Sequence, residues 1–363
     1  MSARVKLLST IAADVVFLAV VLVLAGLFLE VVARAVQRNT RPMIPFVLDE
    51  LGGPRLEADL DLPVRLVHYN RMQLTTDAIG ARVVDPAARE AARADGILFV
   101  GDSQVLGWGL SFGETAAARL AQRLRIPADR VTILAAPSQD PERELNWARA
   151  YARAHPQHEH IEVVALNMGN DLDEIYLGRV GMRLPSGGTF TSWLSRHSVA
   201  FLDFSLLRRS VSQWQRDEHQ EVNYAVLLLN DAERALLAEC VVASLDSLLK
   251  ALPPADQRLI LIIPQDTQVA LSQFKKYRSL YRTESDYAIH ESAQRRAVQR
   301  LEALQSDVLQ RLKTLGIPAV VVEPALRAAL DKPDLIDTHS HHLMARGQDI
   351  TAQVLAKAVE GQL

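Results

Sequence analysis

The segment ILFVGDSQVLGWG, residues 97–109, carries a serine where α/β enzymes place a nucleophile. Its apolar run ends abruptly at Gly101, Asp102 and Ser103. Short apolar runs bounded by glycine are typical of buried strands in parallel sheets. Active sites in such sheets lie just beyond the carboxyl ends of the strands. The pattern therefore predicts that Ser103 lies at the carboxyl edge of a parallel sheet. The same three residues are also typical of an ordinary turn or helix N-cap.

Two later clusters have the same form. The apolar run IEVVALNM, residues 161–168, ends at Gly169, Asn170 and Asp171. Near the C-terminus, LIDTHSHHLMARG supplies Asp337 and three histidines ahead of an amphipathic helix. Acyl transfer needs a hydroxyl nucleophile, a histidine that takes its proton, an acid that orients the imidazole and donors that stabilise an oxyanion. The order serine, asparagine, aspartate, histidine predicts this chemistry.

These clusters resemble the motifs of the SGNH hydrolases, also called the GDSL family, and most of all its bacterial members with an N-terminal membrane segment. Gly101, Asp102 and Ser103 match the first block, and residues 169–171 match the third. The resemblance covers the chain from about Ile97 onward. It implies a three-layer α/β/α domain with a flavodoxin-like parallel sheet and no cofactor. It further implies that Ser103 is the nucleophile, and that its backbone amide and the Asn170 side chain donate to the oxyanion.

The second block departs from the family pattern. The family offers a glycine whose amide completes the oxyanion hole, and Ser138 stands at that position, in the loop AAPSQDPEREL. A serine amide donates as well as a glycine amide unless the loop needs a positive φ. We expect Ser138 to be the third oxyanion donor. The missing glycine also leaves open a binding or scaffold protein whose chemistry has decayed.

The last block also departs from the family pattern, in which aspartate and histidine lie three residues apart. Here Asp337 precedes His339 by two residues and His342 by five. In the family the catalytic histidine lies five residues before a glycine that opens the last helix, and Gly347 has this spacing from His342. We therefore expect Asp337 and His342 to complete the triad. His339 stays the alternative base, because Asp-Thr-His resembles the form of some envelope polysaccharide acetyltransferases.

A metal site at these histidines is the less favoured alternative. Adjacent histidines such as His341 and His342 seldom point at one ion, and no cysteine or second histidine cluster completes a tetrahedral set. The 363 residues carry a net charge of −3, which gives no electrostatic attraction to nucleic acid. The single cysteine, Cys240, excludes an internal disulfide, and its helical surroundings predict a core position.

The N-terminus predicts a membrane location. Residues 15–29 are uncharged and apolar on every face, and the run approaches the length that a bilayer requires. Arginines flank it on both sides, so charge does not settle its orientation. A cleavable signal peptide ending near Ala33-Arg34-Ala35 is the alternative. The family resemblance implies a single-pass anchor in the inner membrane, with the catalytic domain on the periplasmic side.

The rest of the chain divides around these features. We expect a cytoplasmic tip and anchor over residues 1–36, a linker and small β subdomain over 37–95, and the catalytic domain over 96–363. A lid or substrate-binding insertion is predicted at about 176–223. Alternating patterns predict further strands at 131–135, 161–168, 259–264 and in IPAVVVEP, with helices at 112–124, 141–154, 285–315 and 350–359. Gly80, Ala81 and Arg82 resemble a Gly-x-Arg element that precedes the serine block in similar proteins.

These expectations converge on an envelope-facing esterase or O-acyltransferase that works through an acyl-serine intermediate. Its substrates would be acyl esters, above all acetyl esters, of cell-envelope glycans, and a membrane partner would supply an acyl donor if the reaction is a transfer. A lipase or lysophospholipase is a further alternative, because the chain carries an apolar N-terminal segment and an aromatic insertion.

Overall fold

The architecture was obtained from a computed structural model of the 363-residue chain. It describes residues 16–18, 20–29, 31, 46–48, 54–65, 71–88, 96–137, 139–156, 159–169, 171–172, 175, 230–265, 268–269, 284–331, 334–337 and 342–362. The chain divides into two compact units, residues 1–41 with 183–221 and residues 42–182 with 222–363. The five-stranded sheet and the helices that cover it belong to the second unit.

A five-stranded parallel sheet forms the centre of this unit. Its strands are β5 (Ile97–Gly101), β6 (Val131–Ala135), β7 (Glu159–Asn167), β8 (Ala255–Ile263) and β9 (Ala319–Val321), in the spatial order β6-β5-β7-β8-β9. This is the 2-1-3-4-5 order of flavodoxin-like sheets, in which ligands bind where the order reverses, between the first and third strands. Here that reversal lies between β5 and β7, the strands that precede the first and third motifs.

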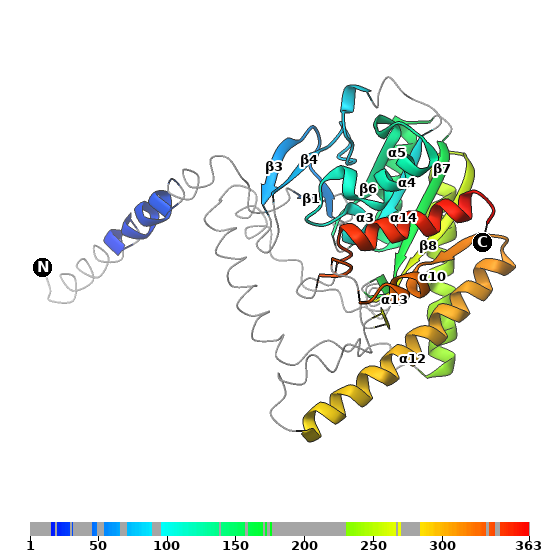
Figure 1. The fold of residues 1–363 in the computed structure, drawn as a ribbon. Coiled ribbons are helices and arrows are strands. Elements are labelled where there is room, and N and C mark those ends of the chain that lie inside the picture. Colours follow the sequence, from blue (N-terminus) through cyan, green and yellow to red (C-terminus); the bar gives the residue numbers. More distant parts are fainter. Residues whose placement is uncertain are drawn as a thin grey trace, which may run out of the picture. The chain divides into compact units, whose positions relative to one another are not determined.

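Helices cover both faces of the sheet, which confirms the predicted α/β architecture. They are α3 (Ser103–Leu106), α4 (Ala116–Leu124), α5 (Pro141–Ala154), α10 (Asp231–Ala251), α12 (Glu284–Thr314), α13 (Glu323–Ala328) and α14 (Ala345–Val359). The connection from β5 to β6 and the connection from β6 to β7 run in opposite directions along the sheet. Because both crossovers are right-handed, their helices lie on opposite faces. Accordingly, α4 packs against α14, whereas α10 packs against both α5 and α12 (Figure 1).

Most elements lie where the sequence predicted them, and the exceptions have local causes. Strand β6 and helix α5 have the predicted bounds. The predicted helix at 112–124 is divided into a 3₁₀ turn, Phe112–Glu114, and α4, because Thr115 is extended and caps the new helix through a bond from the Ala118 amide. Helix α14 begins at Ala345 and not at Ile350, because the polar residues of its first turns hid the apolar periodicity.

Two small antiparallel sheets precede the main one. Strands β1 (Phe46–Leu48) and β2 (Pro54–Leu56) form the first, and β3 (Asp61–Arg65) and β4 (Arg71–Thr75) form the second. The chain then joins the main sheet at Arg82, whose amide donates to the Ile133 carbonyl oxygen at 2.8 Å. The buried Arg82 therefore does more than complete a hairpin turn.

Described residues of the predicted anchor, 16–18, 20–29 and 31, are helical. Their large apolar side chains have exposed fractions between 42% and 70%. Within the part of the chain that the structure describes, no helix combines the length and the apolar character needed to cross a membrane.

Strand β7 buries two carboxylates, Glu159 and Glu162, and the second has a strongly shifted pKa. Glu162 on β7 is fully buried and lies opposite Arg258 on β8, with 3.3 Å between Oε2 and the Arg258 Nε atom. Burial raises the pKa of Glu162 to about 8, although the charge of Arg258 opposes the rise, and the nearby Glu159 adds to it. At pH values between 4.5, the ordinary pKa of a glutamate, and about 8, folding is therefore accompanied by the uptake of a proton at Glu162.

Because the folded state binds this extra proton, the free energy of unfolding should fall as the pH rises through that window. We expect Glu162→Gln to remove part of the fall, on the order of 1 kcal/mol or more between pH 5 and pH 8. Denaturant titrations of the full chain in detergent at both pH values measure it. The matched control is Glu360→Gln, an exposed position that should keep the wild-type pH dependence. If the free energy of unfolding changed with pH equally in Glu162→Gln and wild type, the raised pKa of Glu162 would be contradicted.

Candidate active site

Ser103 lies at the first position of α3, directly beyond the carboxyl end of β5. Asp102 caps this short helix, because its Oδ1 accepts from the Gln104 amide at 2.9 Å. A Cβ atom at Gly101 would lie 2.5 Å from the Val105 Cγ2 atom, so only glycine lets α3 pack this closely on the strand. The N-cap interpretation and the nucleophile interpretation of this motif are thus compatible: Asp102 caps, and Ser103 presents its hydroxyl.

His342 faces that hydroxyl. The Nε2 atom of His342 lies 2.8 Å from Ser103 Oγ, which is the spacing of a nucleophile and its general base. The Asp337 amide donates to the His342 carbonyl oxygen at 2.8 Å, and Ile336 pairs with Leu343 in an antiparallel bridge. This backbone pairing brings the acid beside the base despite their five-residue separation. The structure thus brings His342 to Ser103 and joins Asp337 to His342 through the backbone, and the role of the Asp337 carboxylate in the triad stays a prediction.

Two buried glutamines hold the histidine segment against the nucleophile helix. The Gln104 Oε1 atom accepts from the Leu343 amide at 2.9 Å, one residue after the base. Gln348 on α14 donates from Nε2 to the Gln104 carbonyl oxygen and accepts from the Ala116 amide, both at 2.8 Å. These bonds connect α3, α4, α14 and the histidine segment. A displacement of any one of these four would change the distance between Ser103 and His342.

A second network joins the first and third motifs at the reversal of the sheet. Asn167, the last residue of β7, donates from Nδ2 to Asp102 Oδ2 at 2.7 Å. Its Oδ1 atom accepts from the Gly169 amide at 2.9 Å, and its own amide donates to Asp171 Oδ2 at 2.7 Å. Asp102, Asn167 and Asp171 are buried. The network thus fixes the residues on both sides of Asn170 relative to the nucleophile turn.

The other predicted site residues, Ser138, Asn170 and His339, lie outside the described residues, as does the predicted insertion at 176–223. Their placement stays a prediction. Described residues frame two of them: Asn170 lies between Gly169 and Asp171, and the Ser138 loop leads to Asp140, the cap of α5. Burial raises the pKa of Asp140, against the opposing bonds from the Arg143 and Glu142 amides.

Sequence reasoning missed Asn167, Gln104, Gln348 and Trp108. A polar residue at the end of an apolar strand, next to a glycine, was a usable signal for Asn167. The roles of Gln104 and Gln348 depend on contacts with residues more than 200 positions away, which no local pattern encodes.

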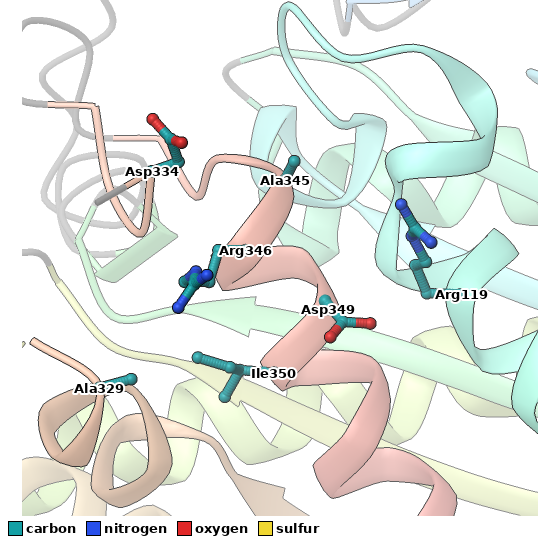
Figure 2. A pocket seen from close by; sticks show the side chains of 7 residues that line it. All are labelled: Arg119, Ala329, Asp334, Ala345, Arg346, Asp349 and Ile350. Atoms are coloured by element: carbon teal, nitrogen blue, oxygen red, sulfur yellow. The ribbon is translucent and has the colours of Figure 1, made fainter. Parts of the chain in front are cut away.

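A separate cavity of about 580 Å³ lies beside the first turns of α14 (Figure 2). Its lining residues are Arg119, Ala329, Asp334, Ala345, Arg346, Asp349 and Ile350. Neither Ser103 nor His342 lines it, so it is not the space in which the Ser–His pair would act. Asp349 is already paired with Arg123 at 2.7 Å.

No protein-family model and no curated protein matches the sequence. Solved structures with similarity to the chain include a carbohydrate acetylesterase from Sinorhizobium meliloti, with a TM-score of 0.38, 12% identity, and coverage of 74% of this chain and 100% of that chain. A member of the lipolytic G-D-S-L family from Veillonella parvula DSM 2008 has a TM-score of 0.36, 11% identity and coverage of 74% and 100%. A GDSL-like lipase from Bacteroides thetaiotaomicron VPI-5482 has a TM-score of 0.33, 13% identity and coverage of 76% and 91%.

The Gln104 acceptor yields a kinetic prediction. Gln104→Met keeps the shape of the side chain but removes the acceptor of the Leu343 amide, which leaves a buried donor unpaired and loosens His342. We expect stability to fall by about 1 to 3 kcal/mol and turnover of p-nitrophenyl acetate to fall roughly 10-fold, with little change in KM. Gln104→Glu, which keeps an acceptor oxygen, should retain more of the turnover than Gln104→Met. Equal turnover by wild type and Gln104→Met, per folded molecule, would show that the bond does not align the base.

Proposed function

We propose that this protein is an SGNH-type serine ester hydrolase or acyltransferase. The observation that supports it is the 2.8 Å separation of Ser103 Oγ and His342 Nε2, at the carboxyl edge of the sheet where its strand order reverses. A scaffold protein would not need a hydroxyl and an imidazole within hydrogen-bonding distance. Here Ser103 and His342 lie 239 residues apart in the sequence and are in contact.

The geometry supports a two-step reaction. His342 Nε2 takes the Ser103 proton as Oγ attacks the ester carbonyl carbon, and the carbonyl oxygen becomes an oxyanion. When the tetrahedral intermediate collapses, the bond to the alcohol breaks, and His342 returns the proton to the leaving oxygen. Water or an acceptor hydroxyl then loses its proton to His342 as it attacks the acyl carbon. The bond between that carbon and Ser103 Oγ breaks, and His342 returns the proton to Oγ. Asp337 holds the base in its orientation.

The oxyanion hole in this proposal consists of the Ser103 amide, the Ser138 amide and the Asn170 side chain. Donors of this kind act because they are held in place before charge develops, and each contributes on the order of 100-fold to 1,000-fold in turnover. The Asn167 network supports this role. It holds Gly169 and Asp171, which flank Asn170, against the Asp102 cap of the nucleophile helix.

The proposed substrates are acetyl or other acyl esters of cell-envelope glycans, and a membrane partner would supply the acyl donor if the reaction is a transfer. The proposal also places the chain as a single-pass protein of the inner membrane, with its catalytic domain in the periplasm. Support comes from the apolar residues of the N-terminal helix, whose side chains are exposed over residues 16–31 where described. Apolar surface of this extent is stabilised by transfer out of water.

The nucleophile and base are tested by substitution in the full chain. We expect a fluorophosphonate probe to label wild type and not Ser103→Ala, and that variant to lose ester turnover, because Ser103 supplies the hydroxyl that lies 2.8 Å from His342 Nε2. His342→Gln should lower turnover at least roughly 1,000-fold. The comparison variant His339→Gln should keep turnover within about threefold if His342 is the base. Labelling of Ser103→Ala, or loss of turnover in His339→Gln alone, would overturn the assignment. Release of acetate from acetylated glycan, compared with long-chain p-nitrophenyl esters, tests the substrate class.

The location is tested with a reporter joined after Leu363. Alkaline phosphatase is active only on the extracytoplasmic side of the membrane, so the fusion should be active and should sediment with the membrane fraction. The control is the same fusion without residues 1–36, which should stay in the soluble cytoplasmic fraction and be inactive. An inactive full-length fusion of normal abundance would contradict the proposed orientation and would exclude envelope glycans as substrates.

A further inference from the structure

Trp108 stacks on the proposed base. The indole and the His342 imidazole have ring centroids 5.6 Å apart and an interplanar angle of 17°. An aromatic face attracts a cation within about 6 Å of the ring centroid, and tryptophan is the strongest of the aromatic residues in this respect. His342 becomes a cation each time it holds the serine proton. The contact is therefore made with a ring whose charge changes during the reaction.

The turn that carries Trp108 is held from two sides. Gly107 has a φ of 71°, a left-handed conformation that favours glycine, and the Trp108 amide donates to the Ser103 carbonyl oxygen at 3.3 Å. The Arg82 guanidinium also holds this turn, because it donates to the Leu106 carbonyl oxygen at 2.5 Å and to the Leu110 carbonyl oxygen at 2.8 Å. Arg82 thus binds the backbone before and after Trp108, and the indole keeps a defined place beside His342.

Arg82 keeps its charge in this role. Its side chain is fully buried, and burial lowers its pKa to about 10, with the charge of Glu114 acting in the opposite direction. At neutral pH it is therefore a cation held by backbone carbonyl oxygens. The bonds to Leu106 and Leu110 compensate for burying that charge.

We propose that Trp108 is a positioning residue that holds the plane of the His342 ring and stabilises its imidazolium form. The proposal rests on the proposed function, in which the proton leaves Ser103 Oγ for His342 Nε2 and later passes to the leaving alcohol. In both transition states the imidazole carries positive charge, and the negative π face of the indole stabilises that charge. The role differs from substrate binding, because its effect falls on turnover and on the proton affinity of the base.

Charged residues also lie on the elements that surround the site. Among the described residues these are Asp337 on its own segment, Asp102 at the start of α3, Asp171 after β7, Arg346 in the first turn of α14, and Arg82 and Glu114 near the Trp108 turn. None of them changes in a Trp108 variant. A comparison of variants at this one position therefore isolates the contribution of the indole.

The test compares Trp108→Leu, which fills space without a π face, with Trp108→Phe, which keeps a smaller one. Turnover of p-nitrophenyl acetate by the full chain is measured across pH and divided by the number of sites that a fluorophosphonate titrates. For Trp108→Leu we expect kcat at its plateau to fall about 3- to 30-fold with KM nearly unchanged. The acidic limb of the kcat/KM profile should move about 0.5 to 1 pH unit lower. Trp108→Phe should lie between Trp108→Leu and wild type.

A readout independent of activity separates this proposal from the proposed function. In an NMR titration of the histidine side chains, with the His342 signals identified by their absence from His342→Gln, the His342 midpoint should move lower in Trp108→Leu. An unmoved midpoint overturns the role of Trp108, whatever the enzyme does. A rise in KM alone overturns it in favour of substrate contact, and a lower yield of folded protein with normal kcat overturns it in favour of packing alone. A wild type that is neither labelled nor active contradicts the proposed function and leaves the NMR result to decide the role of the stack.

Discussion

The hydrogen-bonding distance between Ser103 and His342 is the constraint on which the rest of the site depends. The two residues lie 239 positions apart, and a general base must be within about 3 Å of the oxygen whose proton it takes. Neither residue holds the other by itself, since one hydrogen bond contributes only about 1 kcal/mol net. The distance is set by the elements behind them. The two glutamines, the 336–343 pairing and the packing of α14 on α4 all act on this one separation.

The sheet explains why these elements meet at one place. Helix α4, which follows β5, and helix α10, which follows β7, pack on opposite faces of the sheet, so the connections diverge at the carboxyl ends of these two strands. The gap between these strand ends is flanked by Asp102, directly after β5, and by Asn167, the last residue of β7. Asp102 and Asn167 bridge it with a buried hydrogen bond, which makes the first and third motifs one rigid unit. Preorganised donors are effective in catalysis only when such a unit holds them.

Buried polar side chains hold much of the backbone around the site in place. Arg82, Asp102 and Gln348 are all buried, and each donates to or accepts from backbone groups that shape the site. A buried polar group that loses its partner costs more than an apolar contact contributes, so these networks favour a single geometry. Arg82 extends this control to the small strands before the main sheet. The N-terminal part of the unit therefore influences the nucleophile turn through Arg82.

Local sequence patterns determined the parallel sheet, most of its helices and the residues of the proposed triad. They did so because glycine-bounded apolar runs, capping residues and motif spacing act over a few neighbouring residues. The choice of His342 came from its spacing to Gly347, in the first turns of α14, compared with the spacing in the family that the motifs resemble. Which buried side chains hold that histidine was decided only by the tertiary structure. Gln104 and Trp108 acquire their roles from contacts across more than 200 residues, and the physical reason is that hydrogen bonds and ring stacking depend on distance in space.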